Sequence, residues 1–293
     1  MKFSWKKALV ILVFAGCLGL VLAFPKPVVS PLVPTSLGLK QVINGVLEGS
    51  DGTYGIVVKN LKTGEYYAQN EDRSFDTASL YKLWVMGAVF DQLESGRLTM
   101  DQILSADASF LNQEFGITDD YAEITSGPVS YSVGEALEQM IGISDNYAAL
   151  LLTDKVGLSE VSSFLAKNGF TRSFVGTGTK LPTTTPAEVA LFFEKLYNGQ
   201  LAAAQSTDKM LAILKSQRLN DDLPKYLPDG TIIAHKTGEL EPFIHDAGIV
   251  YSESGDYIIV VMSETNSRPQ AEERIALISK TVYQYFATKS TSS

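Results

Sequence analysis

The chain has 293 residues, of which 45% are hydrophobic, and a formal net charge of −9 at pH 7. This length and apolar content are enough to bury the core of one globular domain. The acidic balance argues against a nucleic-acid partner, because binding to a phosphate backbone needs a basic surface. The single cysteine, Cys17, excludes an intrachain disulfide.

The chain begins with a segment that predicts export. Three lysines among the first seven residues precede an uncharged apolar run from Ala8 to Phe24, and Pro25 ends this run. A positive end followed by an apolar core is typical of a secretory signal peptide, and the run also reaches the short limit for a membrane-spanning helix. No small-x-small cleavage site follows, which favours an uncleaved N-terminal membrane anchor over residues 1–24. In either case we expect an extracytoplasmic protein, periplasmic or at the cell surface, that touches the membrane only through this segment.

Cys17 offers a third possibility for this segment. Phe14-Ala15-Gly16-Cys17 is similar to a bacterial lipoprotein cleavage box, although a phenylalanine replaces the usual leucine. Residues 25–36 then carry four prolines and predict a semi-rigid tether. The remaining residues, 37–293, are predicted to form one compact domain.

The first predicted elements of this domain are a hairpin and a buried helix. Two short β-rich runs, Gly55–Asn60 and Gly64–Ala68, are joined by a turn. In Ala78–Ser95 the apolar residues surround most of a helix circumference, so we expect a central helix that Gly96 ends. Thr99–Val129 has scattered glycines and acidic residues, which predict short helices and loops.

The middle of the chain is predicted to be helical. Ser144 falls on a short connection, Gly142–Asp145, between two of these helices, and Thr185-Pro186 is a typical helix start. Ser206 is expected to cap the following helix. The predicted helices cover Ser132–Ile141, Asn146–Val156, Leu158–Asn168 and the segment from Thr185 to the residue before Gly199.

After Asp229-Gly230 the apolar periodicity changes to that of strands. With the early hairpin, these strands predict an antiparallel β-sheet from residues 37–75 and 230–293, flanked by terminal helices, and an all-helical lobe over residues 76–229. The predicted fold class is therefore α/β, of the α+β kind. The late elements are predicted as strands Thr231–Lys236, Ala247–Ser252 and Tyr257–Ser263 and a closing helix, Pro269–Ala287.

Ser79 and Lys82 lie three residues apart at the start of the predicted central helix. Residues i and i+3 share a helix face, so the hydroxyl and the amine can approach each other there. A serine becomes a nucleophile when a neighbouring base takes its proton, and a lysine is such a base when burial or another cation keeps it neutral. The helix N-terminus would stabilise an oxyanion formed on a carbonyl that Ser79 attacks. The pattern therefore predicts serine acyl transfer.

Such a pair alone is common on solvated helix faces, and two later motifs make it specific. Ser144-Asp145-Asn146 and then Lys236-Thr237-Gly238 follow it in the chain. From residue 50 or so to its end, the chain resembles the class A β-lactamase and penicillin-binding-protein family, whose three motifs occur in this order. The resemblance implies a β-lactamase/transpeptidase-like fold, a catalytic domain over residues 37–293 and a serine nucleophile at Ser79.

The Lys236-Thr237-Gly238 motif is expected on an edge strand that faces the Ser79 helix across a cleft. Lys236 supplies a cation that attracts a substrate carboxylate and, by repulsion, helps to keep Lys82 neutral. Thr237 can hydrogen-bond the same carboxylate, and Gly238 leaves room for an extended substrate to lie against the strand.

The resemblance also implies three roles in the cleft. Ser144 corresponds to the residue that passes a proton to the departing nitrogen, and Asn146 to a contact with the amide of the substrate side chain. The backbone N–H of Glu239 corresponds to the second oxyanion donor. A glutamate here is unusual and would crowd or repel an anionic substrate unless it points to solvent, so it bears on specificity.

One residue that the family pattern requires is missing. In class A enzymes a glutamate on a loop after the Ser-Asp-Asn motif holds the water that hydrolyses the acyl-enzyme, yet Val161–Ala187 contains no Asp or Glu. The usual general base of deacylation is absent, and we expect this step to be slow. The alternative is that a carboxylate from elsewhere, Glu114, Glu123 or Glu239, takes this role.

Three functions fit these motifs. The favoured one is a serine hydrolase that opens β-lactams through a Ser79 ester. A D-alanyl-D-alanine peptidase or penicillin-binding protein uses the same motifs without the glutamate, and a catalytically weak binding domain would keep only the cleft. The two histidines, His235 and His245, are not expected to be catalytic, and no metal-ligand spacing occurs, so we expect neither metal nor other cofactor.

Overall fold

The computed structural model describes residues 38–176 and 180–290. The predicted signal or anchor segment (1–24), with Cys17, and the predicted tether (25–36) lie outside these described residues. Within the described ranges no helix is both long and apolar enough to cross a membrane.

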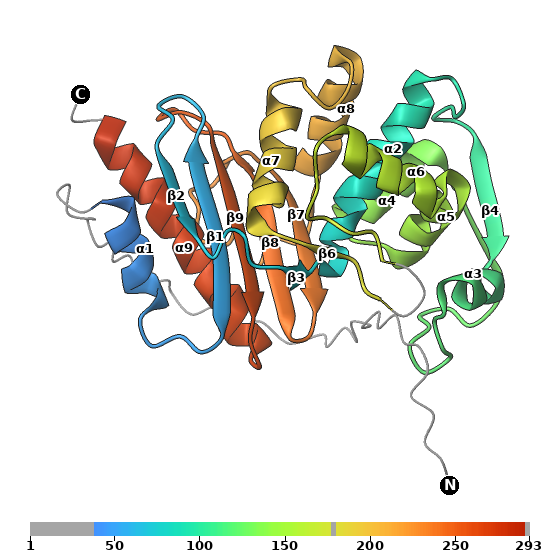
Figure 1. Cartoon of the computed structure of the whole chain (residues 1–293), viewed down its shortest axis with the longest axis horizontal. Helices are drawn as coiled ribbons and strands as arrows, with labels where there is room; N and C mark the ends of the chain where they lie inside the picture. The colour runs from blue at the N-terminus through green and yellow to red at the C-terminus, as the bar shows by residue number, and fades with distance from the viewer. Residues whose placement is uncertain (1–37, 177–179, 291–293) are drawn as a thin grey trace, which may run out of the picture.

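The sheet has five antiparallel strands in the order β2-β1-β9-β8-β7. The predicted early hairpin is confirmed, and its first strand pairs with the last strand of the chain, so that Tyr54 lies opposite Ser263. The edge strand β7 lies nearest to the helical lobe (Figure 1). The strands are β1 (Thr53–Asn60), β2 (Tyr66–Gln69), β7 (Ile233–Leu240), β8 (Phe243–Val250) and β9 (Tyr257–Glu264).

The sheet separates two hydrophobic cores. On one face α1 (Leu39–Leu47) and α9 (Arg268–Ser290) pack against each other and cover the strands (Figure 1). Ile43, Ile259 and Ile278 are fully buried there. The opposite face is covered by the helices of the lobe. The predicted terminal helices are therefore present, and the closing helix is longer than expected at both ends.

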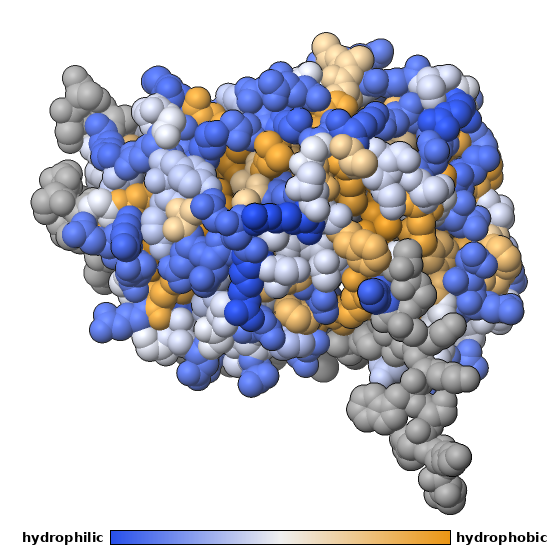
Figure 2. All heavy atoms as spheres, viewed as in Figure 1, coloured by the Kyte–Doolittle hydropathy of each residue, from blue (hydrophilic) through white to orange (hydrophobic). Residues whose placement is uncertain are grey.

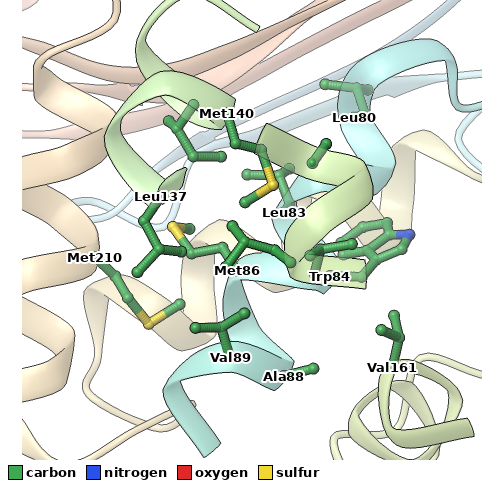
Figure 3. Packing of buried hydrophobic residues seen from close by; sticks show 14 of the residues in the cluster. Leu80, Leu83, Trp84, Met86, Ala88, Val89, Leu137, Met140, Val161 and Met210 are labelled. Carbon is green, nitrogen blue, oxygen red and sulfur yellow. The ribbon is translucent and has the colours of Figure 1, made fainter. Parts of the chain in front are cut away.

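Helix α2 (Lys82–Glu94) is the centre of the lobe, because ten of its 13 residues are buried. Its side chains point to several sides, as Trp84 and Met86 show in Figure 3. A Cβ atom on Gly87 would lie 2.2 Å from Phe164 Cζ, so α2 and α6 (Leu158–Lys167) approach each other at a distance that only glycine permits. The residues at the start of α2 are thus held by a rigid element.

The lobe that was predicted to be all-helical also contains strands. β4 (Ile103–Asp107) pairs with β5 (Pro128–Ser132), and β3 (Phe75–Asp76) pairs with β6 (Thr183–Thr184). The prediction of only short helices and loops over Thr99–Val129 is wrong, because β4 is formed by pairing with a distant segment rather than by its own propensity. The other lobe helices are α3 (Ala108–Phe115), α4 (Val133–Gly142), α5 (Asn146–Val156), α6 (Leu158–Lys167), α7 (Pro186–Tyr197) and α8 (Ala204–Lys215).

Three boundaries near functional residues also differ from the predictions. Strand β7 continues through the Lys-Thr-Gly motif to Leu240, and β8 begins early enough to contain His245, which was expected to precede the strand. Tight pairing of the two strands overrides the low strand propensity of Gly238 and Glu239. Ser206 lies inside α8 and does not cap it, because the helix already begins at Ala204.

Candidate active site

The predicted nucleophile lies on a short 3₁₀ turn, Ala78–Tyr81, that leads into α2. Ala78 has a φ angle of 45°, in the left-handed region that a non-glycine side chain disfavours. Ser79 follows directly and lines the cleft. Strain in the residue before a nucleophile is typical of a position that function requires, since local stability alone would not select it.

Lys82 is fully buried below this turn. Its Nζ donates hydrogen bonds to the backbone oxygen of Ser144 (2.6 Å), to Asn146 Oδ1 (2.8 Å) and to Ser144 Oγ (3.1 Å). Burial lowers the pKa of Lys82 well below its usual value, and repulsion from Lys236 lowers it further. The expected repulsion is therefore present, but burial is the larger cause.

Ser144 lies between the two lysines. Its backbone is in the left-handed region, with a φ angle of 59°, as the sharp connection between α4 and α5 requires. This turn aims Oγ at both amines, which lie 3.1 Å (Lys82) and 3.0 Å (Lys236) away. Asp145, the middle residue of the motif, caps α5 by accepting a hydrogen bond from the N–H of Ala148 (2.7 Å). The tripeptide thus caps α5 through Asp145 and places the side chains of Ser144 and Asn146 in the cleft wall.

Lys236 reaches the same point from the edge strand β7. Its fully buried Nζ donates to Ser144 Oγ (3.0 Å) and to the backbone oxygen of Thr237 (2.7 Å). Burial lowers the pKa of Lys236 to about 7, although the negative charges of Asp246 and Glu239 raise it. The lysine is therefore poised between its charged and neutral forms near neutral pH.

These groups lie beneath a cleft of about 680 Å³. The cleft wall includes five of the predicted site residues, namely Ser79, Ser144, Asn146, Thr237 and Glu239. Gly238 also has a packing role that the sequence did not predict. A Cβ atom there would lie 3.1 Å from the backbone oxygen of Thr77 and 3.2 Å from Leu80 Cγ, so this glycine lets β7 approach the nucleophile's turn.

The structure adds residues that no motif indicated. Glu123 Oε1 accepts a hydrogen bond from Asn146 Nδ2 (2.6 Å), which fixes the amide whose oxygen contacts Lys82. Glu239 does not point freely to solvent, because it forms an ion pair with Arg268 (2.8 Å) at the start of α9. Neither Glu123 nor Arg268 could be identified from a local sequence pattern, because each contacts a residue in a separate segment of the chain.

The segment that lacks acidic residues lies along the same cleft. Among its described residues, the apolar Val161, Val175 and Leu181 contribute to the wall together with the cation Lys180, and none of the contributing residues is acidic. Glu188, the first acidic residue after the segment, is 6% exposed and accepts hydrogen bonds from Arg172 N–H and from Ser173 Oγ–H. Its carboxylate therefore stabilises the loop and does not line the cleft.

Both histidines have structural partners. His235 Nδ1 lies 2.9 Å from Asp246 Oδ1 in the sheet interior. His245 accepts a hydrogen bond from the N–H of Ser263 (3.1 Å) and donates one to the backbone oxygen of Asp76 (2.8 Å). Burial lowers the pKa of His245 to about 4, so it is neutral at physiological pH. Neither residue lines the cleft in the described part of the chain.

The fold and this serine–lysine arrangement define a serine acyl-transfer hydrolase. A family model described as "Beta-lactamase enzyme family" matches residues 38–286, and the chain belongs to this family. It is a serine β-lactamase-like hydrolase with the α/β fold that the sequence predicted.

Individual relatives are distant but cover most of the chain. A β-lactamase of Streptomyces fradiae is 25% identical over 78% of this chain and 79% of its own length, and β-lactamase VEB-1 of Pseudomonas aeruginosa is 25% identical over 84% and 90%. Among solved structures, PBP-A is 27% identical with a TM-score of 0.72, covering 85% of this chain and 96% of its own. A β-lactamase from Sphaerobacter thermophilus, at 24% identity, shares the fold with a TM-score of 0.75 over 86% and 97%.

Proposed function

We propose that the protein opens β-lactams by forming an ester between Ser79 and the lactam carbonyl carbon. The observation that carries this proposal is the hydrogen-bonded series Lys82–Ser144–Lys236, whose central serine lines the same cleft as Ser79. The related VEB-1 is named a β-lactamase, and PBP-A with a leucine-to-glutamate substitution is described as an acyl-enzyme complex with penicillin G. Both relatives support a β-lactam as the acyl donor.

Acylation needs one proton to move from Ser79 to the departing nitrogen. Lys82, whose pKa burial lowers, takes this proton in its neutral form, when Nζ has given up its donation to Ser144 Oγ and accepts from Ser79 Oγ instead. The Ser79 oxygen then bonds to the carbonyl carbon, the carbon–nitrogen bond of the lactam breaks, and the proton passes from Lys82 through Ser144 Oγ to the nitrogen. The backbone N–H groups of Ser79 and Glu239 hold the oxyanion.

Deacylation lacks an equivalent base. Where the loop segment borders the cleft, the described wall holds Val175, Leu181 and the cation Lys180 but no carboxylate, and none occurs in Val161–Ala187. General-base assistance is typically worth about 10²–10⁴-fold in rate, so we expect the acyl-enzyme to be long-lived. Glu114, Glu123 and Glu239 line the cleft, but Glu123 and Glu239 are held by Asn146 and Arg268.

A second candidate function is a D-alanyl-D-alanine peptidase or penicillin-binding protein. The missing glutamate favours it, as does the similarity to PBP-A. Turnover of a D-alanyl-D-alanine peptide, with release of D-alanine, would separate it from a β-lactamase. Both substrates occur outside the cytoplasm, which agrees with the extracytoplasmic location that the N-terminal sequence predicts.

Acylation can be tested by intact-mass spectrometry after mixing the full-length protein with penicillin G. We expect one adduct on the wild type and none on Ser79→Ala. Ser162→Ala, which changes an exposed serine on α6, should be acylated like the wild type. An adduct that persists on Ser79→Ala would contradict the assignment of the nucleophile.

A further inference from the structure

One wall of the cleft carries five ionisable side chains that the acylation chemistry does not use. We call it the charged wall; its members are Asp221, Asp222, Glu239, Arg268 and Glu272. The helical lobe, on the right of Figure 2, instead brings hydrophobic residues to the surface. Arg268 Nη2 is 2.8 Å from Glu239 Oε2, and Arg268 Nε donates to Glu272 Oε1 at 2.6 Å. The guanidinium is therefore paired with two carboxylates of the same wall.

The charged wall borders the part of the cleft where Lys236 and Thr237 would meet a substrate carboxylate. Thr237 and Glu239 are two residues apart on β7, so their side chains point to the same face of the sheet, roughly 7 Å apart along the strand. Both residues line the cleft. Burial lowers the pKa of Lys236, while the negative charges of Asp246 and Glu239 raise it. Glu239 therefore acts on the same part of the site as Lys236 and Thr237.

A second carboxylate lies beside Thr237. Asp246 on β8 is directly opposite Thr237 in the strand register, so the two side chains share a face of the sheet. Asp246 is fully buried, and its Oδ2 accepts a hydrogen bond from the N–H of Leu223 at 3.0 Å. This contact holds the segment that carries Asp221 and Asp222 against the strand pair. Acidic residues thus approach Thr237 from β7, from β8 and from the segment before Leu223.

The charge of this region is net negative. Asp222 is 2% exposed, and burial raises its pKa to about 9, so near neutral pH it is uncharged. The other three acidic members of the charged wall outnumber its one cation, Arg268. Lys236 adds a positive charge, but its Nζ already donates to Ser144 Oγ and to the backbone oxygen of Thr237. A substrate carboxylate would therefore find both Lys236 and Arg268 engaged by groups of the protein.

We propose that Glu239 and Glu272 withhold Arg268 from the substrate, and that the site accepts acyl donors whose leaving group carries an uncharged ester or amide carbonyl in place of a carboxylate. Such a carbonyl accepts a hydrogen bond from the hydroxyl of Thr237 without meeting repulsion from the charged wall. In a peptide donor it corresponds to an amide bond that continues the chain beyond the departing residue. This inference rests on the proposed acylation of Ser79 and adds the chemical class of the leaving group.

Benzylpenicillin and its methyl ester are matched probes, because they share the β-lactam nucleus and the acyl side chain and differ in the carboxylate alone. Second-order rates of adduct formation on the full-length protein would be measured by intact-mass time courses at pH 6, below the pKa of about 7 of Lys236. Each rate is divided by the rate of alkaline hydrolysis of the same compound, which corrects for intrinsic reactivity. We expect the carboxylate-to-ester ratio of these normalised rates to be below about ten in the wild type. An unpaired cation about 7 Å away would raise this ratio by roughly three- to fiftyfold, depending on the local dielectric.

Charge variants show whether the two glutamates are responsible. Glu239→Gln and Glu272→Gln each remove a negative charge and a partner of Arg268, so each should raise the carboxylate-to-ester ratio by roughly three- to fiftyfold. The use of two variants keeps the test valid if one folds poorly. Adding Arg268→Gln to Glu239→Gln should abolish the gain, which assigns it to the released guanidinium. Glu48→Gln makes the same change of net charge at an exposed residue that does not line the cleft, and it should leave the ratio unchanged.

The outcomes separate this inference from the proposed function. Absence of an adduct on the wild type with both compounds would overturn both proposals. Acylation by benzylpenicillin with a wild-type ratio above the limit of about ten would overturn the inference about the charged wall alone. A ratio that stays unchanged in both Glu239→Gln and Glu272→Gln would do the same.

Discussion

The two sides of Ser79 differ in how they are built. On the side of acylation, Lys82, Ser144 and Lys236 converge from three separate elements and hydrogen-bond one another. On the side where deacylation would occur, the loop segment lines the cleft with Val161, Leu181 and the cation Lys180, and with no carboxylate. The difference predicts that separate parts of the fold serve the two half-reactions, and that this chain carries the groups for acylation without the usual base for deacylation.

The acylation side is also the costlier one to fold. Two fully buried lysines are expensive to remove from water, and each is retained only because backbone, hydroxyl or amide oxygens accept its hydrogen bonds. A well-packed apolar core would not need them. Burial lowers the pKa of both lysines. The same burial therefore costs folding free energy and makes the amines easier to deprotonate.

The largest expected effect comes from removing the base of the acylation side. Lys82→Ala should lower the acylation rate by about 10²–10⁴-fold, because Ser79 loses its proton acceptor. The rate would be measured by intact-mass time courses with penicillin G. Lys155→Ala, which removes an exposed lysine on α5, should leave the rate unchanged. A Lys82→Ala variant that acylates as fast as the wild type would remove this lysine from the mechanism.

A second prediction concerns the deacylation side of the cleft, where a carboxylate can be introduced by substitution. Leu181 lines the cleft in the segment without acidic residues. Leu181→Glu should accelerate deacylation by about tenfold or more, because part of the usual general-base contribution is restored, while acylation changes little. Steady-state hydrolysis after the first turnover measures this step. Leu181→Gln, of the same size but without basicity, should not accelerate it, and equal gains in both variants would point to loop loosening instead.

The charge of Lys236 predicts that the acylation rate depends on pH. Because the pKa of this lysine is lowered to about 7, its positive charge is present below pH 7 and lost as the pH rises above it. Acylation by a carboxylate-bearing penicillin should therefore decline on the alkaline side by up to about tenfold per pH unit. Lys236→Arg keeps its charge at every accessible pH. Its normalised profile should extend to higher pH, and a profile identical to that of the wild type would assign the decline to another group.

The smallest expected effect concerns the stability contribution of Asp222, a buried carboxyl group at the edge of the cleft. The pKa of Asp222 is raised to about 9, above its unfolded value, so the folded state must bind a proton that the unfolded state releases. Stability should fall as the pH rises from about 4 towards 9. Asp222→Asn removes this titration and should stabilise the protein by about 1–3 kcal/mol at pH 8, with a smaller gain at pH 5. Thermal unfolding at the two pH values measures the difference, and an equal change at both would contradict it.

The sequence was sufficient to predict the site residues that belong to short local motifs. Ser79 and Lys82 are one helical turn apart, and the other two motifs are contiguous tripeptides, so local reading was sufficient. The strand runs of the antiparallel sheet and the closing helix also followed from periodicity.

What the sequence could not predict depends on contacts between distant segments. The pairing of β4 with β5 and the approach of Gly238 to Thr77 are visible only in three dimensions. The same holds for the ion pair of Glu239 with Arg268, whose residues carry no common motif. Long-range pairing of this kind leaves little trace in a local pattern.

The most direct test of the imbalance between the two sides is a stopped-flow reaction of the full-length protein with a chromogenic cephalosporin. We predict a burst of about one product equivalent per protein, followed by a steady phase slower by about 10²–10⁴-fold, because acylation is assisted and deacylation is not. The burst should be absent in Ser79→Ala. Fast linear turnover of the wild type without a burst would show that a carboxylate does reach the acyl-enzyme, and it would contradict the account.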